Sequence, residues 1–539
     1  MRKLLACVSA AALLVAGCGE VSNSGGSGSG GGSGSGQVAV AADQVTPEAL
    51  KAAVKDERVK KFYEARDWAA VWDQGKADEL MAALDEAQSH GINKETYHKD
   101  ATSGANAAER EAGLTLAALN YGQTLATGMV DPKKLFEVYE VPMHKTDVVA
   151  GLGQAVEQGG VRAWLAGLAP QDAEYKALQQ AYAGYAKQAA GEQRETIQPG
   201  DKIGRGDKDP RVPAIAAALR ANGYLAASEP AGQQPESKVV PKAKAAQPKP
   251  AAKQAAPSTT FTAAMAEAVK KVQADYGIQP DGVIGNATIE ALNTGAKERA
   301  RILAVNMERR RWLEREPAKT RIDVNTAAAE LTYIRDGALA NRRKVVVGQP
   351  DWETPELNSP IVRLVANPDW TVPDSIAEEE IIPKGAAYMA KENIKMVNGR
   401  LVQQPGPKSA LGLVKFDMSN AHAIYLHDTP AKALFGSTAR HASHGCARVE
   451  DALGFARMLA EHQGQLEAFD KALATKKETP VSLPNQIPVR LLYHSAYSDG
   501  GKVIFRTDPY AWDDKVAQAM GLPGQIRPRV KTHVTDIGP

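Results

Sequence analysis

The stretch from His422 to Val449 reads HAIYLHDTPAKALFGSTARHASHGCARV, and the rest of the chain is organised around it. It contains four of the chain's ten histidines and ends just beyond Cys446. A thiol attacks a carbonyl carbon only as the thiolate, and a nearby imidazole is the usual means of forming a thiolate near neutral pH. The stretch therefore indicates a cysteine nucleophile that is served by a histidine.

The residues around the cysteine have the character that such chemistry needs. The apolar run Ala423–Leu426 predicts a strand, so His427 lies at a strand end, which is a rigid mount for a general base facing Cys446. Gly445 has no Cβ, so the backbone can turn tightly there and approach a reacting carbonyl. Backbone amides from His444 to Cys446 are candidates for holding an oxyanion.

Three further side chains are candidate members of this site. The Tyr425 hydroxyl is a second candidate for the oxyanion, and Ser443 and His444 are expected to orient the loop or His427. Arg448 carries a planar guanidinium, which suits a substrate carboxylate and equally suits a structural salt bridge.

Two other interpretations of the same residues are open. His441, His444 and Cys446 have the side chains that zinc prefers, but a structural zinc site usually has a second cysteine pair, which this chain lacks. A lone cysteine is also often buried and inert. The density of histidines favours the nucleophile, so we expect no metal and no cofactor.

The sequence SHGC (443–446) followed by Ala447-Arg448-Val449, with His427 upstream in YLHDTP, resembles the signature of the L,D-transpeptidases, the YkuD-type enzymes that cross-link peptidoglycan. Many members of that family carry Asn at the position of Arg448, and the large YcbB-like subgroup of Gram-negative bacteria tolerates Arg there. Further stretches that resemble this subgroup are NMERRRWL (306–313), VVVG (345–348), TPELNSPI (354–361), NPDWTVP (367–373) and QPGPKSALGLVKF (404–416).

The resemblance implies roles and substrates. Cys446 attacks the donor, a tetrapeptide stem, at the carbonyl of the diaminopimelate L-centre, and His427 is the base. D-Ala leaves, and the side-chain amine of a second stem resolves the thioester into a 3→3 cross-link. It also implies that carbapenems acylate Cys446.

The same site can serve other acceptors, and these alternatives stay open. Water would make the protein an L,D-carboxypeptidase, a D-amino acid an exchange enzyme, and a lysine an enzyme that anchors proteins to peptidoglycan. A non-catalytic wall-binding lipoprotein is a different class, against which the intact Cys446 and His427 weigh. A papain-like protease is disfavoured, because its cysteine is expected near the mature N-terminus.

The charge balance bears on partners. Lys and Arg number 65 against 63 Asp and Glu, a net charge of +2. Nucleic acid as the main partner would need a basic face, so this balance argues against it. We expect peptidoglycan stems as donor and acceptor, the membrane through a lipid, and cell-wall synthesis proteins as possible partners.

The N-terminus predicts a lipoprotein of the cell envelope. Residues 1–17 have a basic start and an apolar run too short to span a bilayer, which is typical of a signal peptide. Val15-Ala16-Gly17-Cys18 resembles a lipobox, with Cys18 acylated, and residues 18–45 include a Ser/Gly-rich tether. By resemblance to other lipoproteins, Gly19 favours the outer membrane, and we expect the protein on the periplasmic side of the envelope. Of the three cysteines only Cys446 then remains as a thiol.

A chain of 539 residues exceeds a single core, so several domains are expected. The fold class is multidomain α+β: a mostly β catalytic domain with a helical capping insertion, a helical scaffold domain and a small three-helix peptidoglycan-binding domain. The predicted boundaries are 46–195 for the scaffold, 200–295 for the peptidoglycan-binding-like unit with a disordered insert at 228–260, and 299–539 for the catalytic domain with a cap at about 374–407.

Overall fold

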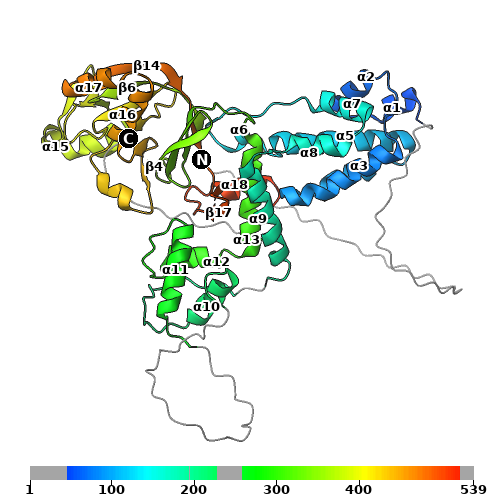
Figure 1. Ribbon diagram of the computed structural model, residues 1–539, viewed down its shortest axis with the longest axis horizontal. Coiled ribbons are helices and arrows are strands. Elements are labelled where there is room, and N and C mark those ends of the chain that lie inside the picture. Colours follow the sequence, from blue (N-terminus) through cyan, green and yellow to red (C-terminus); the bar gives the residue numbers. More distant parts are fainter. Residues whose placement is uncertain (1–44, 193–194, 227–257, 523–539) are drawn as a thin grey trace, which may run out of the picture. The chain divides into compact units, whose positions relative to one another are not determined.

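The structure, a computed structural model, describes residues 45–192, 195–226 and 258–522 (Figure 1). The predicted signal peptide, Cys18 and all but the last residue of the tether lie outside these ranges. None of the helices within the described ranges is both long enough and apolar enough to cross a membrane.

The predicted insert 228–260 lies outside the described residues except at its C-terminal end, where the prediction is wrong. The Asp209 amide donates to the Thr259 carbonyl at 3.0 Å, and Lys208 forms an antiparallel bridge with Thr260. These backbone contacts fix the end of the segment against the start of the same unit.

The described chain begins with helices, whose first turns are capped by side chains. The Asp56 carboxylate accepts from the Arg58 amide at 2.8 Å, and Asn106 accepts from the Glu109 amide at 2.9 Å. In Figure 1 the long helices of this part lie side by side. The helices are α1 (Pro47–Ala53), α2 (Glu57–Glu64), α3 (Gln74–Asp85), the 3-10 helix η2 (Glu86–His90), α4 (Glu95–Thr102), α5 (Ala107–Thr127), α6 (Pro132–Leu135), α7 (Val148–Gln158), α8 (Val161–Leu168) and α9 (Ala173–Ala189).

A smaller helical unit follows, made of α10 (Val212–Ala221), α11 (Ala263–Asp275) and α12 (Asn286–Asn293). The apolar side of α11 is buried against its neighbours, with Val269 and Val272 fully enclosed. The turn before α12 is held by Gln273, whose amide side chain accepts from the Gly282 amide and donates to the Val283 carbonyl, both at 2.9 Å.

Helix α13 (Ala296–Trp312) runs beside α9 (Figure 1), and most of its charged side chains are buried. Arg309 contacts Asp513 at 2.5 Å and Arg311 contacts Glu308 at 2.7 Å, and these four side chains are at most 2% exposed. The sequence of α13 is rich in charged residues. The structure shows that opposite charges neutralise one another inside the protein.

The catalytic part is built on a twelve-stranded mixed sheet in the order β1-β5-β15-β2-β3-β4-β13-β11-β10-β6-β14, with β12 paired to β4. Strand β10 shows why its residues form a strand, since its side chains alternate between buried and half-buried. The strands are β1 (Tyr139–Glu140), β2 (Arg321–Asn325), β3 (Glu330–Arg335), β4 (Ala338–Gly348), β5 (Glu356–Asn358), β6 (Ile361–Ala366), β10 (Val414–Met418), β11 (Leu426–His427), β12 (His441–Ser443), β13 (Ala447–Val449), β14 (Thr479–Ile487) and β15 (Val489–Leu492).

The insertion between β6 and β10 is helical in its first half, as predicted, and also contains a hairpin. Its helical turns are α14 (Asp374–Ile376), the π-helical turn η3 (Ala377–Ile381), the 3-10 turn η4 (Ile382–Lys384) and α15 (Gly385–Lys391). Strands β8 (Ile394–Val397) and β9 (Arg400–Gln403) pair with each other, and β9 pairs with β7 (Trp370–Thr371). The insertion, which we call the cap, has a small apolar core of its own.

The chain ends in further helices and a hairpin. Two helices follow Cys446, α16 (Ala452–His462) and α17 (Leu466–Ala474), and they are separate because Gly464 takes a left-handed φ of +67° between them. The predicted hairpin is confirmed as β16 (Ala496–Asp499) and β17 (Lys502–Phe505), and α18 (Trp512–Ala519) follows. The fold class is therefore multidomain α+β, as the sequence predicts.

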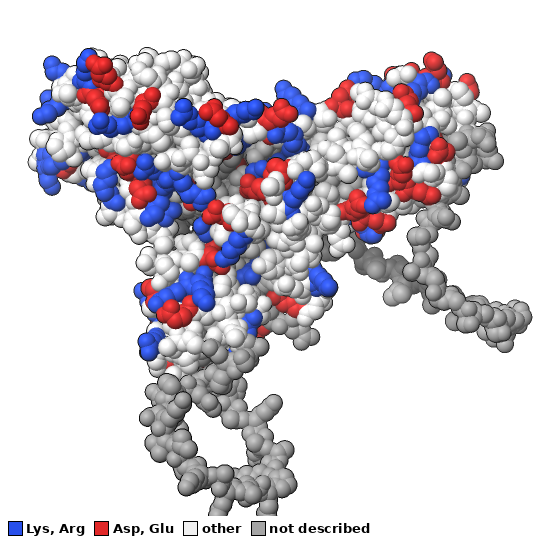
Figure 2. All heavy atoms as spheres, in the orientation of Figure 1, with Lys and Arg blue, Asp and Glu red and all other residues white. Residues whose placement is uncertain are grey.

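Acidic and basic side chains are interspersed over the face shown in Figure 2. This mixture agrees with the net charge of +2 of the whole chain. On this face the protein presents both signs of charge to a partner.

Candidate active site

Pairing between two short strands assembles the candidate site. Strand β11 pairs in parallel with β13, so that Leu426 lies opposite Ala447 and His427 lies opposite Arg448. Successive side chains on a strand point to opposite faces, so Tyr425 and His427 share the face on which Cys446 and Arg448 lie. The register therefore gathers four of the predicted site residues on one face of the sheet.

The opposite face of these strands is core. Leu426 and Ala447 belong to the main apolar cluster, and Phe416 of β10 packs on Phe455 of α16 with ring centroids 5.6 Å apart. Helix α16 thus closes one side of the sheet. Cys446 belongs to the same apolar cluster, and Tyr425 packs both against that cluster and against the core of the cap.

The Cys446 thiol is buried, with 4% of the residue exposed. Its sulfur lies 3.6 Å from the Ala423 carbonyl, and the Tyr425 hydroxyl bonds to it. Burial raises the pKa of the Cys446 thiol to about 11, although contacts with Tyr425 and the charges of Lys415 and Arg448 pull it down. The resting group is therefore a thiol, and it needs a base to react near neutral pH.

His427 is positioned to be that base. It is fully buried, and its Nδ1 lies 2.5 Å from the Asp428 carbonyl oxygen. A carbonyl oxygen only accepts, so Nδ1 carries the hydrogen, and in the neutral ring Nε2 is the nitrogen that can take a proton. Its ring meets the ring of Tyr425 edge-on at 5.7 Å, and the Tyr425 hydroxyl in turn bonds to the thiol.

The loop that carries the cysteine is pinned by its own side chains. Ser443 Oγ donates to the Cys446 carbonyl at 2.6 Å and accepts from the Gly445 amide at 3.3 Å. Gly445 has a φ of +114°, which a residue with a Cβ adopts only under strain. Because the Gly445 amide is engaged with Ser443, the Cys446 amide is the better candidate for holding an oxyanion.

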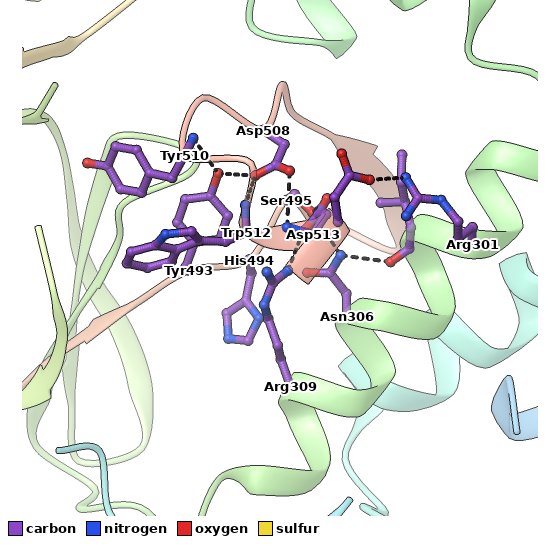
Figure 3. Close-up of polar contacts among 12 residues, drawn as sticks. Arg301, Asn306, Arg309, Tyr493, His494, Ser495, Asp508, Tyr510, Trp512 and Asp513 are labelled. Carbon is purple, nitrogen blue, oxygen red and sulfur yellow. Dashed lines mark hydrogen bonds and ion pairs between the residues drawn. The ribbon is translucent and has the colours of Figure 1, made fainter. Parts of the chain in front are cut away.

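A second layer supports this loop from behind. Thr354 Oγ1 donates to the Gly445 carbonyl at 2.7 Å, and the Tyr510 hydroxyl donates to the Gly348 carbonyl at 2.6 Å. Figure 3 shows Tyr510 beside Tyr493, whose hydroxyl donates to Asp508, and the network continues to Asp513 and Arg309 of α13. Helix α13 and the C-terminal segment thereby buttress the nucleophile loop.

Three neighbours of the site were not identified from the sequence. Lys415 lies opposite His427 across β10 and β11, and its ammonium sits 4.5 Å from the centre of the Tyr425 ring. Glu380 of the cap contacts His444 Nε2 at 2.7 Å, and Trp352 packs edge-on against His444 at 5.0 Å. Lys415 lies within the family-like stretch 404–416, so that stretch was the available signal.

The remaining predicted residues lie at different places. Arg448 is buried, with 1% exposed, so a substrate carboxylate reaches it only if neighbouring groups move, and its substrate-binding role stays a prediction. His422 contacts Glu140 of β1 at 2.9 Å, and His441 bonds to the Thr326 carbonyl at 2.9 Å. Within the described ranges, no three or more His, Cys, Asp or Glu side chains gather in a way that would hold a metal ion.

Comparison with known proteins agrees with this geometry. A family profile described as the L,D-transpeptidase catalytic domain matches residues 319–482, which include Cys446 and His427. A scaffold domain profile matches residues 57–181, and a peptidoglycan binding domain profile matches residues 251–292.

Individual relatives are more distant. A Haemophilus influenzae protein assigned by name to the L,D-transpeptidases is 32% identical over 219 residues, covering 36% of this chain and 45% of that protein. The chain thus spans about half the length of the curated relative.

Two solved structures are also similar in part. The L,D-transpeptidase from Mycobacterium smegmatis is 13% identical with a TM-score of 0.19, covering 33% of this chain and 60% of that one. An L,D-transpeptidase mutant from Enterococcus faecium is 13% identical with a TM-score of 0.18, covering 34% and 52%. Three parts of the chain thus match family profiles, those of an L,D-transpeptidase catalytic domain, a scaffold domain and a peptidoglycan binding domain.

Proposed function

We propose that this protein is a peptidoglycan L,D-transpeptidase that works through a thioester on Cys446. The observation that carries the proposal is the strand register, which places His427 on the face of Cys446 with Nε2 as the nitrogen able to take a proton. An inert buried cysteine would not need a histidine held in one tautomer beside it.

The first half-reaction transfers an acyl group to the enzyme. His427 Nε2 takes the proton from Cys446, and the sulfur attacks the carbonyl carbon of the diaminopimelate L-centre in a tetrapeptide stem. The Cys446 amide and the Tyr425 hydroxyl stabilise the oxyanion. The C–N bond to D-Ala breaks, and the proton on His427 passes to the leaving amine.

The second half-reaction releases the acyl group. The side-chain amine of a second stem's diaminopimelate attacks the thioester carbonyl, losing a proton to His427. The C–S bond breaks, the thiolate regains that proton, and a 3→3 cross-link remains. Because Cys446 is a buried thiol at rest, deprotonation accompanies attack rather than preceding it.

The acceptor decides the outcome, and the other products named above are the alternatives. Hydrolysis, exchange with a D-amino acid and attachment of a protein lysine would all begin from the same thioester. A non-catalytic wall-binding lipoprotein is the competing class, and the organised loop around Cys446 favours an enzyme over it.

We propose a location on the periplasmic side of the cell envelope, with a lipid anchor in the outer membrane. The signal-peptide-like residues 1–17 and the lipobox-like sequence that ends at Cys18 support this proposal. The peptidoglycan-binding unit would then hold the enzyme on its substrate.

The test is incubation of the protein with tetrapeptide-rich sacculi, followed by mass spectrometry of the released muropeptides. Wild type is expected to produce 3→3 dimers and free D-Ala, and Cys446→Ala to produce neither. Tripeptides without dimers would indicate hydrolysis, and identical products from both proteins would remove the enzyme proposal. Intact mass after incubation with a carbapenem checks for an adduct on Cys446.

A further inference from the structure

One contact joins the cap to the nucleophile loop. The carboxylate of Glu380, in the turn η3, lies 2.7 Å from Nε2 of His444, two residues before Cys446. The His444 side chain is 6% exposed and that of Glu380 is 29% exposed, so the contact is largely shielded from water. Shielding strengthens a charge-assisted hydrogen bond relative to one on the open surface.

The three consecutive glutamates of this turn are not equivalent. Glu378 and Glu379 are exposed to solvent. Glu380 is half-buried because Ala377 and Ile381 on either side of it pack into the core of the cap. The cap's own packing therefore aims this carboxylate at the loop.

His444 lies in the loop between Ser443 and Cys446, and its side chain faces the cap. Its neighbours on both sides are pinned, through Ser443 Oγ on the Cys446 carbonyl and Thr354 Oγ1 on the Gly445 carbonyl. The His444 ring is placed between Trp352, at 5.0 Å, and Glu380. Tyr425, whose hydroxyl bonds to the thiol, also packs on the apolar core of the cap.

We infer that Glu380 is a positioning residue, which acts through His444 to keep the Cys446 loop in its reactive shape and to keep the cap seated over the thiol. The inference rests on the proposed function for its effect on turnover, but its effect on the thiol does not. When the contact is lost, the loop and the cap loosen together. Cross-linking then slows because the reacting groups lose alignment, whereas a small reagent reaches Cys446 more easily.

The test uses the full chain with two readouts, the cross-linking rate on sacculi and the alkylation rate of Cys446 by iodoacetamide, followed by peptide-resolved mass spectrometry. Glu380→Gln is expected to lower kcat for cross-linking about tenfold, with a smaller change in KM, and to raise alkylation about fivefold. Glu379→Gln makes the same charge change in the same turn and is the matched control, expected to stay within about twofold of wild type in both.

A double-mutant cycle with His444→Asn isolates the contact. If Glu380 acts through His444, the double variant is no more altered than His444→Asn alone. Additive effects, an unchanged alkylation rate in Glu380→Gln, or equal effects from Glu379→Gln would overturn the inference. A wild type without cross-linking but with the expected alkylation cycle would remove the proposed function and leave the inference standing.

Discussion

Two regions bury ionisable groups in opposite ways. In α13, Arg309 faces Asp513 at 2.5 Å and Arg311 faces Glu308 at 2.7 Å, with every side chain almost wholly enclosed. In the nucleophile loop, the Cys446 thiol is equally enclosed, but burial outweighs the nearby positive charges and raises its pKa to about 11. The helix buries charge and compensates it, whereas the loop keeps its group neutral.

The two regions differ in role: the ion pairs of α13 are structural, whereas the thiol of the loop is available for chemistry. A buried charge with an opposite charge beside it is fixed in place, because moving either partner exposes the other to a poorly solvating interior. A buried neutral thiol is not fixed by an ion pair, and it acquires charge only when a base takes its proton. The helix therefore stabilises the shape of the site, and the thiol of the loop stays neutral until a base takes its proton.

The largest expected effect comes from removing the sulfur. Cys446→Ala should lower cross-linking by about 10⁵-fold or more, because no other side chain is placed to form the thioester. The free energy of unfolding should change by only about 1 kcal/mol, since one small buried atom is lost. Muropeptide analysis and thermal unfolding measure the two quantities, and retention of more than a tenth of the activity would contradict the role of Cys446.

Removing the base should cost less than removing the nucleophile. His427→Gln should lower cross-linking by about 10²–10⁴-fold, the usual contribution of a general base. Because the thiol is neutral at rest, raising the pH should restore part of the lost rate as hydroxide replaces the imidazole. His422→Gln, which alters a histidine that contacts Glu140 rather than the thiol, is the control and should keep its activity. A His427→Gln rate equal to that of wild type would show that another group takes the proton.

For the buried ion pairs of α13, the comparison predicts that a substitution lowers the free energy of unfolding. Arg309→Met leaves the buried Asp513 carboxylate without its guanidinium, so the free energy of unfolding should fall by about 3–5 kcal/mol. Arg457 pairs with Asp470 at 2.8 Å with both side chains more than a third exposed, so Arg457→Met should cost less than about 1 kcal/mol. Denaturant unfolding measures both, and equal losses would mean that burial does not distinguish these pairs.

The same contrast explains which features the sequence could predict. Strand β10 and the buried stripe on α11 were predictable, because alternation and helical spacing are local signals. Cys446 and His427 were predictable because the chemistry needs those side chains and the motif groups them. The partner of Arg309 lies 204 residues away, and Glu380 lies in a separate insertion from His444, so neither contact has a local signal. In both cases a charged side chain within a run of charged residues pairs with a group on a distant segment.

The last prediction is the contribution of the Cys446 thiol to the pH dependence of stability. Folding raises the pKa of Cys446 to about 11, above the ordinary value of a thiol near 8.5. Below the ordinary value, both folded and unfolded chains keep the proton, and the stabilisation is fully present. Between about pH 8.5 and 11 the unfolded thiol ionises first, so unfolding releases a proton and stability falls, by up to about 3 kcal/mol.

Other groups titrate in the same range, so the measurement is the difference between wild type and Cys446→Ala. That difference in the free energy of unfolding should shrink steadily above about pH 8.5, because the variant lacks the proton. Parallel profiles would mean that the folded thiol ionises as easily as the unfolded one. The loop would then hold a compensated charge, as α13 does, and His427 would share an ion pair with Cys446 before any substrate arrives.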